Sequence, residues 1–390
     1  MNYLKNILEI FIISTRLGLT SFGGPSAHLG YFHAEYVDRK KWIDEKSYAD
    51  LVALAQFLPG PASSQVGIGI GVMRGGVLGG LISFLGFTFP SVLVLIIFAS
   101  LMSTFNVGDA SWIQGLKIVA VVIVLHAVLG MAKNLTPDIH RKCIALFAVV
   151  ILLVFPSVLS QVGVIVIAAI VGLLLFKNDD TTHVKTSFPI NKYFSIFCLI
   201  LFFALLIMLP ILREITGNYW ITFIDSFYRS GSLVFGGGHV VLPLLEQEFV
   251  ALNWISEEAF LAGYAATQAV PGPLFTFAAY LGTVMNGWFG GIIATLAIFL
   301  PAFLLILGCL PFWDMIRNHD KAKRAIMGVN AAVVGILFAA LYTPIATSAI
   351  HEPKDFALAA ILFVMLNYLK LAPWIIVLSG AVGGILISFI

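Results

Sequence analysis

The sequence predicts an all-α polytopic membrane protein made of an inverted-topology internal repeat, with re-entrant half-helices that are broken inside the membrane. Composition is the first indication, because 60% of the 390 residues are hydrophobic and only 11% are charged. A soluble domain carries about 25% charged residues, so this composition does not provide a water-exposed surface. The other two indications are a Pro-Gly-Pro motif present in both halves, and basic loops that change sides between the halves.

Apolar stretches of membrane-spanning length follow one another along the chain. The first, residues 4–22, contains Glu9 and Arg16 and is not followed by a small-residue cleavage site, so we expect an uncleaved helix. Short helical pieces are predicted on either side of each chain break. Pro90 and Pro301 lie at corresponding points of two long helices and predict kinks. The full spans are predicted at 76–104, 111–131, 143–158, 160–176, 193–212, 287–312, 320–341, 355–370 and 372–390.

The two halves of the chain match each other at a nearly constant spacing. Residues Arg16, Gly23, Gly24 and Glu35 recur 213 positions later as Arg229, Gly236, Gly237 and Glu248. Gln56 and Gly60 recur 212 positions later as Gln268 and Gly272. Chance does not produce such a series, so the sequence predicts a duplication with an N-terminal repeat at 1–190 and a C-terminal repeat at 191–390.

The charges of equivalent loops predict that the two repeats have opposite orientations. Loop 38–46 carries four basic residues, whereas its counterpart 251–258 carries none and contains two glutamates. In the next pair of loops the bias reverses, because 102–113 has no Lys or Arg and 313–324 has four. Basic loops stay in the cytoplasm. We therefore expect an inverted repeat in the cell membrane, with the N-terminus in the cytoplasm.

The Pro-Gly-Pro motifs at 59–61 and 271–273 are helix breaks. Proline removes a backbone donor, glycine frees the backbone, and a second proline suits the first turn of a new helix. Broken backbone survives in a membrane only where it is buried in protein or lines a cavity, and paired breaks in two halves mark transporter binding sites. The alternative interpretation is that these glycines only allow close helix packing.

Each helix that starts at a break presents unpaired N–H groups and a positive dipole end, which suit an oxyanion. Four such starts are expected, after Gly24, Gly60, Gly237 and Gly272. The candidate substrate-binding residues are Arg16, Gly23, Gly24, Ser26, Gln56, Gly60, Ser63, Ser64 and Gln65 in the first copy, and Arg229, Gly236, Gly237, His239, Gln268, Gly272 and Thr276 in the second.

The matched charged residues have two interpretations each. Arg16 and Arg229 suit anion coordination or gating, because a charge inside a span faces a cavity or a partner; an ion pair with Glu9 or Asp225 is the alternative. Glu35 and Glu248 are candidates for proton coupling, and an interfacial cap or salt bridge is the alternative favoured for them.

The histidines of the first short helix, His28 and His33, are expected at the membrane interface. The three cysteines are scattered and predict no disulfide framework.

The residues around the breaks resemble those of the chromate ion transporter family in its long two-domain form, over nearly the whole chain. The resemblance depends on the combination of the stretches 17–25, 27–30 and 56–61 with their second-half versions 235–239 and 268–273. It implies transport of chromate, typically outward from the cytoplasm, which gives chromate resistance. Sulfate is the similar tetrahedral dianion that such a site must accept or reject.

The second copy departs from the first at its break, where Leu274-Phe275-Thr276 replaces Ser63-Ser64-Gln65. We therefore expect an asymmetric site in which the first copy supplies most ligands.

The leading functional prediction is a secondary transporter of a divalent oxyanion, because no phosphate-cradling Gly-Lys-Ser/Thr motif is present. Antiport against protons is left open. The alternative is an anion channel or an uptake transporter for another oxyanion such as sulfate. An intramembrane enzyme would need metal-ligand clusters or paired acidic motifs, and none is apparent. No catalytic residue, metal, cofactor or nucleic-acid partner is therefore predicted; the expected partners are the oxyanion and the lipid bilayer, with a homodimer left open.

Overall fold

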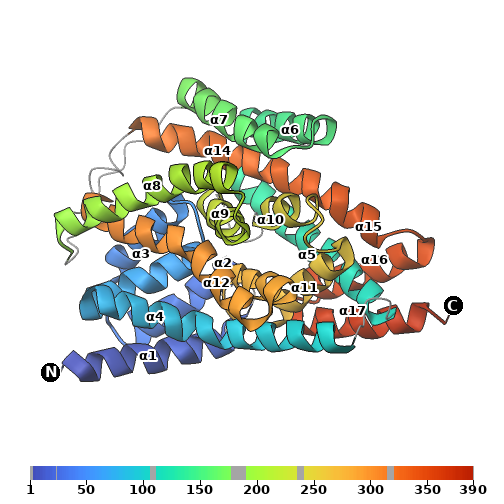
Figure 1. Ribbon diagram of the computed structural model, residues 1–390, viewed down its shortest axis with the longest axis horizontal. Helices are drawn as coiled ribbons and strands as arrows, with labels where there is room; N and C mark the ends of the chain where they lie inside the picture. The colour runs from blue at the N-terminus through green and yellow to red at the C-terminus, as the bar shows by residue number, and fades with distance from the viewer. Residues whose placement is uncertain are drawn as a thin grey trace. The chain divides into compact units, whose positions relative to one another are not determined.

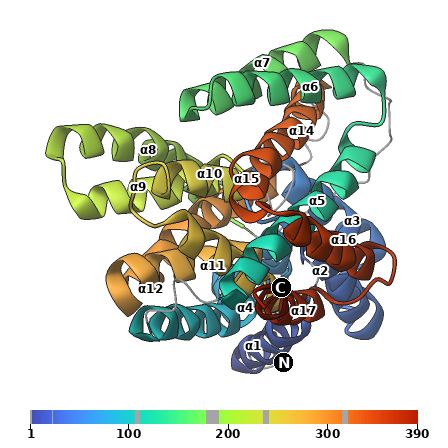
Figure 2. The same cartoon turned by 90° about the vertical axis from the view of Figure 1, so that its right-hand side faces the viewer.

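The computed structural model describes residues 3–22, 24–105, 111–176, 190–234, 241–313 and 320–389, and all regular elements in those ranges are helices (Figures 1 and 2). Among the described residues, five helices are long and apolar enough to cross a membrane. They are Ala62–Met102, Ser111–Leu135, Lys192–Thr216, Leu274–Phe312 and Lys323–Ala349. The predicted class, a polytopic α-helical membrane protein, is therefore confirmed.

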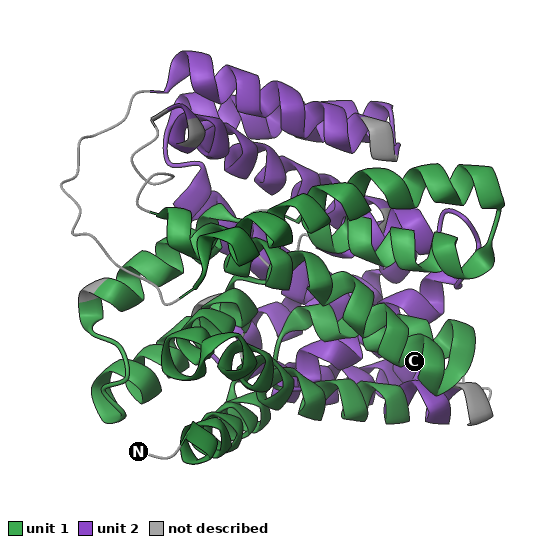
Figure 3. Cartoon of the chain, turned by 60° about the vertical axis from the view of Figure 1, so that its left-hand side comes forward, with its two compact units in different colours: residues 1–97, 180–238, 271–319 green, residues 98–179, 239–270, 320–390 purple. Residues whose placement is uncertain are grey.

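The chain forms two compact units, and each is assembled from segments of both sequence halves (Figure 3). Unit 1 comprises residues 1–97, 180–238 and 271–319, and unit 2 comprises residues 98–179, 239–270 and 320–390. Neither unit coincides with a repeat predicted at 1–190 or 191–390, and the division into these repeats stays a prediction.

Unit 1 contains the two long helices that follow the Pro-Gly-Pro motifs. Its elements are α1 (Tyr3–Thr20), α2 (Gly24–Phe32), the π-helix η1 (His33–Arg39), α3 (Glu45–Phe57), most of α4 (Ala62–Phe105), α8 (Lys192–Thr216), α9 (Tyr219–Ser232), η3 (Leu274–Thr276), α12 (Phe277–Cys309) and η4 (Leu310–Phe312). Unit 2 contains α5 (Ser111–Leu135), α6 (Ile139–Val154), α7 (Val158–Leu175), α10 (Val241–Phe249), α11 (Glu257–Ala269), α14 (Asp320–Ala340), η5 (Leu341–Ala346), α15 (Thr347–Ala349), α16 (Pro353–Asn367) and α17 (Pro373–Ile387).

Three of the predicted full spans correspond to helices that are shorter than a membrane crossing. The spans predicted at 143–158, 355–370 and 372–390 are α6, α16 and α17, which have 16, 15 and 15 residues. A straight crossing takes about 20 residues, so these helices fall short of the hydrocarbon thickness. α6 and α16 begin at polar caps, Asp138 and Glu352.

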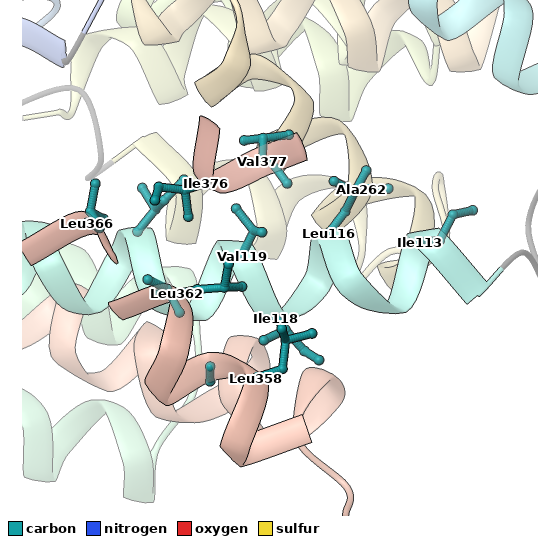
Figure 4. Close-up of a cluster of buried hydrophobic side chains, with 14 residues drawn as sticks. Ile113, Leu116, Ile118, Val119, Ala262, Leu358, Leu362, Leu366, Ile376 and Val377 are labelled. Carbon is teal, nitrogen blue, oxygen red and sulfur yellow. The ribbon is translucent and has the colours of Figure 1, made fainter. Parts of the chain in front are cut away.

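The core of unit 2 is built around α5 (Figure 4). Leu116 and Val119 of α5 pack in one cluster with Leu362 of α16 and Ile376 of α17. Small residues bring the backbones close, since a Cβ atom on Gly115 would lie 1.9 Å from the Gly380 carbonyl oxygen. Close approach at glycine is how helices associate in lipid, where apolar burial between helices provides little driving force.

The outward surfaces of several helices are apolar. On α8, Phe197 is 57% exposed and Ile200 is 61% exposed. Large exposed apolar surfaces mark contact with a partner or with lipid, and the hydropathy of α8 indicates lipid.

Both long helices of unit 1 bend sharply at matched positions. In α4 the backbone leaves helical geometry at Gly75 and Gly76, and Gly76 has φ +63°. In α12 the same change occurs 211 residues later, at Asn286 and Gly287, with φ +61° at Gly287. Residues of non-glycine type rarely adopt this conformation, so glycine permits the bend. The backbone angles remain helical through Pro90 and Pro301, so the departures from helical geometry lie at the glycines, and the kinks expected at the prolines stay a prediction.

Each bend folds the helix back on itself. A Cβ atom on Gly71 would lie 2.4 Å from the Gly79 carbonyl oxygen, so the segments before and after Gly76 are in contact. The same close approach joins Gly282 and Gly290. The piece before the first bend, 62–74, is about 20 Å long at 1.5 Å per residue, less than the ~30 Å hydrocarbon layer. The predicted pieces at 61–73 and 76–104 therefore correspond to the two arms of a helical hairpin.

Candidate functional site

The Pro-Gly-Pro breaks have nearly identical backbone conformations. Gly60 has φ +113° and Gly272 has φ +111°, values that side chains other than glycine rarely tolerate. Before the first break, α3 ends at Phe57, the residue that caps it, Leu58, has an extended backbone, and α4 begins at Ala62. The interruption predicted at Gly60 is therefore present, and the next helix starts with N–H groups that have no intrahelical acceptor.

The two breaks of unit 1 are linked by reciprocal hydrogen bonds to the opposite copy. The Gly60 N–H donates to the Val234 carbonyl at 2.7 Å, and the Gly272 N–H donates to the Ser21 carbonyl at 3.0 Å. Ser21 and Val234 are themselves equivalent, since they are 213 positions apart and each precedes a Gly-Gly stretch. The glycine amides are therefore occupied by protein carbonyls, and any free N–H groups belong to the helix starts that follow.

Buried polar side chains gather at the start of α4. Ser63 and Ser64 are each 2% exposed and Gln65 is fully buried. The Ser63 hydroxyl lies 3.3 Å from Nδ1 of His28, and Nε2 of Gln65 donates to the Pro59 carbonyl at 2.9 Å. Among the described residues, the Ser64 hydroxyl and Oε1 of Gln65 have no hydrogen-bond partner. Buried polar atoms without partners are rare and call for an additional group such as a ligand or water.

His28 lies next to the candidate site, and the sequence interpretation did not place it there. It was expected at the interface, but it is 1% exposed, and its ring meets Phe87 edge-on with 5.5 Å between centroids. The expectation is wrong because α2 turns this face of the helix toward α4, where Ser63 provides a polar partner. Its position four residues after Gly24, on the helix that starts at that break, was the available signal.

The second break is less polar. The Thr276 hydroxyl, 1% exposed, donates to the Pro273 carbonyl at 2.7 Å, which occupies its proton. A Cβ atom on Gly272 would lie 2.5 Å from the Ser91 hydroxyl, so Ser91 of α4 lies directly against this break. The Ser91 hydroxyl donates to the Thr88 carbonyl at 3.1 Å.

Other predicted residues are placed elsewhere or not described. Gln56 on α3 is exposed. Gln268 on α11 and Glu248 on α10 are 8% and 7% exposed and belong to unit 2. Gly24 starts α2 with φ +78°. Gly23, Gly236, Gly237, His239 and the side chain of Ser26 lie outside the described residues.

Arg16 and Glu35 form an ion pair. Arg16 on α1 pairs with Glu35 on η1, and Arg39 bonds the same carboxylate at 3.1 Å. Glu35 is 5% exposed. The alternative partner weighed for Arg16, Glu9, pairs instead with Lys40 at 2.8 Å. The favoured interpretation of Glu35 as a salt-bridge residue matches this arrangement.

Arg229 is held by a buried carboxylate. Asp225, 1% exposed, lies 2.7 Å from Arg229 and 3.3 Å from Arg213. This is the ion pair weighed as the alternative to anion coordination. The guanidinium groups of the two matched arginines, Arg16 and Arg229, thus each contact a carboxylate within unit 1.

The described residues contain no group of three or more His, Cys, Asp or Glu side chains placed to hold a metal ion.

A scan of protein families matches the chain to the family described as chromate transporter, over residues 8–173 and again over 220–385. An uncharacterized transporter of Methanocaldococcus jannaschii is 29% identical over 353 residues, which cover 85% of this chain and 83% of the relative. The chromate transport protein of Cupriavidus metallidurans is 25% identical over 391 residues, 98% of this chain and 92% of the relative. The uncharacterized transporter YwrA of Bacillus subtilis is 29% identical over 171 residues, which cover 42% of this chain and 96% of the relative. No solved structure matches the chain.

Proposed function

This chain belongs to the chromate transporter family, and on that premise we propose that it is a secondary transporter that exports chromate from the cytoplasm across the cell membrane. Members of this family are transport proteins and not enzymes. Expulsion of a dianion gains about 2.3 kcal/mol per charge per 100 mV from an inside-negative potential. Sulfate, which has the same charge and tetrahedral shape, is the competing substrate.

The observation that carries this proposal is the buried polar cluster at the start of α4. It combines the hydroxyls of Ser63 and Ser64 with the N–H groups of a helix start, and His28 lies beside them. A tetrahedral dianion needs several hydrogen-bond donors, and a helix N-terminus adds a positive dipole end. The Ser64 hydroxyl has no protein partner among the described residues, so it is available to such an anion.

The first copy supplies most of the anion contacts in this proposal. At the second break, Leu274 and Phe275 are buried and apolar, and the Thr276 hydroxyl is directed to Pro273. This asymmetry supports one anion per chain. Arg16 and Arg229 each already contact a carboxylate. We therefore assign to them a contribution to the positive potential around the anion and no direct bond to it. Proton coupling through Glu35 or Glu248 stays a prediction.

Removal of the α4 hydroxyls tests the substrate site. In inverted membrane vesicles, the double variant Ser63→Ala with Ser64→Ala should lower chromate uptake at least tenfold, since each hydrogen bond to a charged ligand contributes about 1.5–3 kcal/mol. Uptake of radiolabelled chromate and sulfate, with imposed potential and pH gradients, measures rate, selectivity and coupling together. Thr216→Ala, at an exposed helix end, is the matched control. If the double variant took up chromate at the wild-type rate, the site assignment would be wrong. If the wild-type protein took up no chromate, chromate would be excluded as its substrate.

The inverted orientation of the repeats is part of the proposal. The family match at 8–173 and 220–385 is displaced by the same 212 residues as the sequence repeat, which supports a duplication. α3 and α11 begin at equivalent residues with equivalent caps: Asp44 accepts from the Ser47 N–H, and Ser256 accepts from the Ala259 N–H. Loop charge supports the inversion, because only the first of these two loops is basic.

Cysteine labelling tests this inversion. With the exposed Cys143 replaced by serine, cysteines introduced as Asp44→Cys and Ser256→Cys should react with an impermeant maleimide from opposite sides of the membrane. Both positions are exposed, so access does not limit the reaction. The unaltered Cys198 and Cys309 are buried and provide the background. Labelling of both positions from one side would show that the repeats share an orientation.

A further inference from the structure

Unit 2 contains a cavity of ≈390 Å³ that the proposed anion site does not use. It lies between the α6–α7 connection, α10 and the end of α14. Its polar lining consists of Glu246, Gln247, Gln161, Ser157 and Thr343, and the remaining lining residues are apolar. None of the described residues that line it is Lys, Arg or His, so the cavity offers no positive side chain to an anion.

Two amide side chains in this cavity lack partners. Gln161 on α7 is 2% exposed, and its Oε1 atom has no hydrogen-bond partner among the described residues. Oε1 of Gln247 on α10 is also buried and without a partner there. Both are oxygen acceptors, and with the Glu246 carboxylate they make a lining that requires a positively charged or hydrogen-bond-donating occupant.

The end of α6 increases the negative potential of the cavity. α6 ends at Val154, and the lining includes Leu153 from its last turn. The last carbonyls of a helix have no intrahelical donor and carry the negative end of its dipole. Next to α14, Thr343 has a non-helical backbone (φ −125°, ψ 120°), so the chain is interrupted where it borders the cavity.

Among the described helices, α7 and α10 have their first turns at the cavity. Pro243, which lines the cavity in the first turn of α10, has no N–H group to donate. α7 begins at Val158, and the Ser157 hydroxyl accepts the Ser160 N–H at 3.1 Å. Glu257 of α11 lies outside the lining but close enough for its charge to act on Glu246. Among the described lining residues, Glu246 carries the one charged side chain, so the side-chain charge of the lining is negative.

We propose that this cavity binds a small monovalent cation, of which sodium is the model, through the Glu246 carboxylate and the amide oxygens of Gln161 and Gln247. Hard cations prefer oxygen ligands, and broken helices in transporters present carbonyl ends to such ions. One lining carboxylate balances one positive charge. The volume accommodates the ion with part of its hydration shell, since a water molecule occupies about 30 Å³. The proposal concerns cation binding by unit 2 and does not depend on which anion is transported.

Sodium binding to the purified full-length protein in detergent tests the proposal. Scintillation proximity with ²²Na⁺ should show saturable binding that unlabelled NaCl displaces and that choline chloride at equal ionic strength does not. Glu246→Gln, which keeps the shape of the side chain and removes its charge, should weaken this binding at least about tenfold. Gln161→Leu removes an oxygen ligand and should weaken it too. Glu214→Gln, at an exposed glutamate of unit 1, is the matched control and should bind as the wild type does.

Each result of this experiment decides the proposal. Absence of saturable ²²Na⁺ binding in the wild type overturns it, as does equal binding in the wild type and Glu246→Gln when both proteins have the same melting profile. Displacement by CaCl₂ at far lower concentration than by NaCl overturns the monovalent assignment. A melting temperature that responds to pH but not to sodium in the wild type, and to neither in Glu246→Gln, assigns the cavity to a proton and also overturns it.

Discussion

Replacing Gly60 with leucine is expected to abolish chromate transport while the protein still inserts into the membrane. Gly60 has φ +113°, and a Cβ atom there would lie 3.1 Å from the Cβ of Ala302. A side chain in this conformation is strained by about 1–3 kcal/mol, and relief of the strain would displace the start of α4 with Ser63 and Ser64. Vesicle uptake of radiolabelled chromate measures the loss. Gly272→Leu should have a similar effect, because its Cβ would lie 2.5 Å from the Ser91 hydroxyl.

The control for this prediction is Gly217→Leu. Gly217 also has a positive φ, +57°, but it caps α8 where no atom lies within 4 Å of an added Cβ. It imposes backbone strain without crowding at a break, so transport should persist. Transport by Gly60→Leu at the Gly217→Leu rate would show that the first break does not position the anion site.

Asp225→Asn is expected to lower the thermal stability of the protein more than Glu35→Gln does. Asp225 is 1% exposed, and the side chains of its partners Arg213 and Arg229 are 23% and 22% exposed. Removal of one member of a buried pair costs about 3–5 kcal/mol, because the remaining charges keep their desolvation penalty. Thermal unfolding in detergent, followed by tryptophan fluorescence, measures this loss.

Glu35→Gln provides the comparison. Glu35 is also buried, but the side chains of its partners Arg16 and Arg39 are 43% and 60% exposed. Water can therefore solvate both arginines after the substitution. We therefore expect a smaller loss than for Asp225→Asn. A larger stability loss for Glu35→Gln than for Asp225→Asn would show that the exposure of the partner arginines does not control the loss of stability.

Local features of the chain were predictable from sequence. The predicted helix at 320–341 is α14, Asp320–Ala340, and the break predicted between 73 and 76 lies at Gly75 and Gly76. Glycine and proline act within a few residues, and polar caps fix helix starts, so these features need no knowledge of the distant chain. The kinks at Pro90 and Pro301 stay a prediction, whereas the departures from helical geometry lie at glycines, because glycine can adopt a positive φ, which proline cannot.

The partners of polar groups were not predictable. The sequence indicates that the Gly60 amide is released from a helix, but not that the Val234 carbonyl accepts it. It indicates that Arg16 needs a partner, but the choice of Glu35 over Glu9 depends on how η1 packs against α1. The burial of His28 similarly depends on tertiary packing, because α2 is short and shows little difference between its faces. Long-range pairing is a property of the folded chain.

The paired bonds from Gly60 to Val234 and from Gly272 to Ser21 have a consequence for motion. Each interrupted loop holds an amide–carbonyl contact with the opposite half, the Gly60 loop with the segment that follows α9 and the Gly272 loop with the segment that follows α1. During a transport cycle each loop must therefore either travel with its partner segment of the other half or give up this bond.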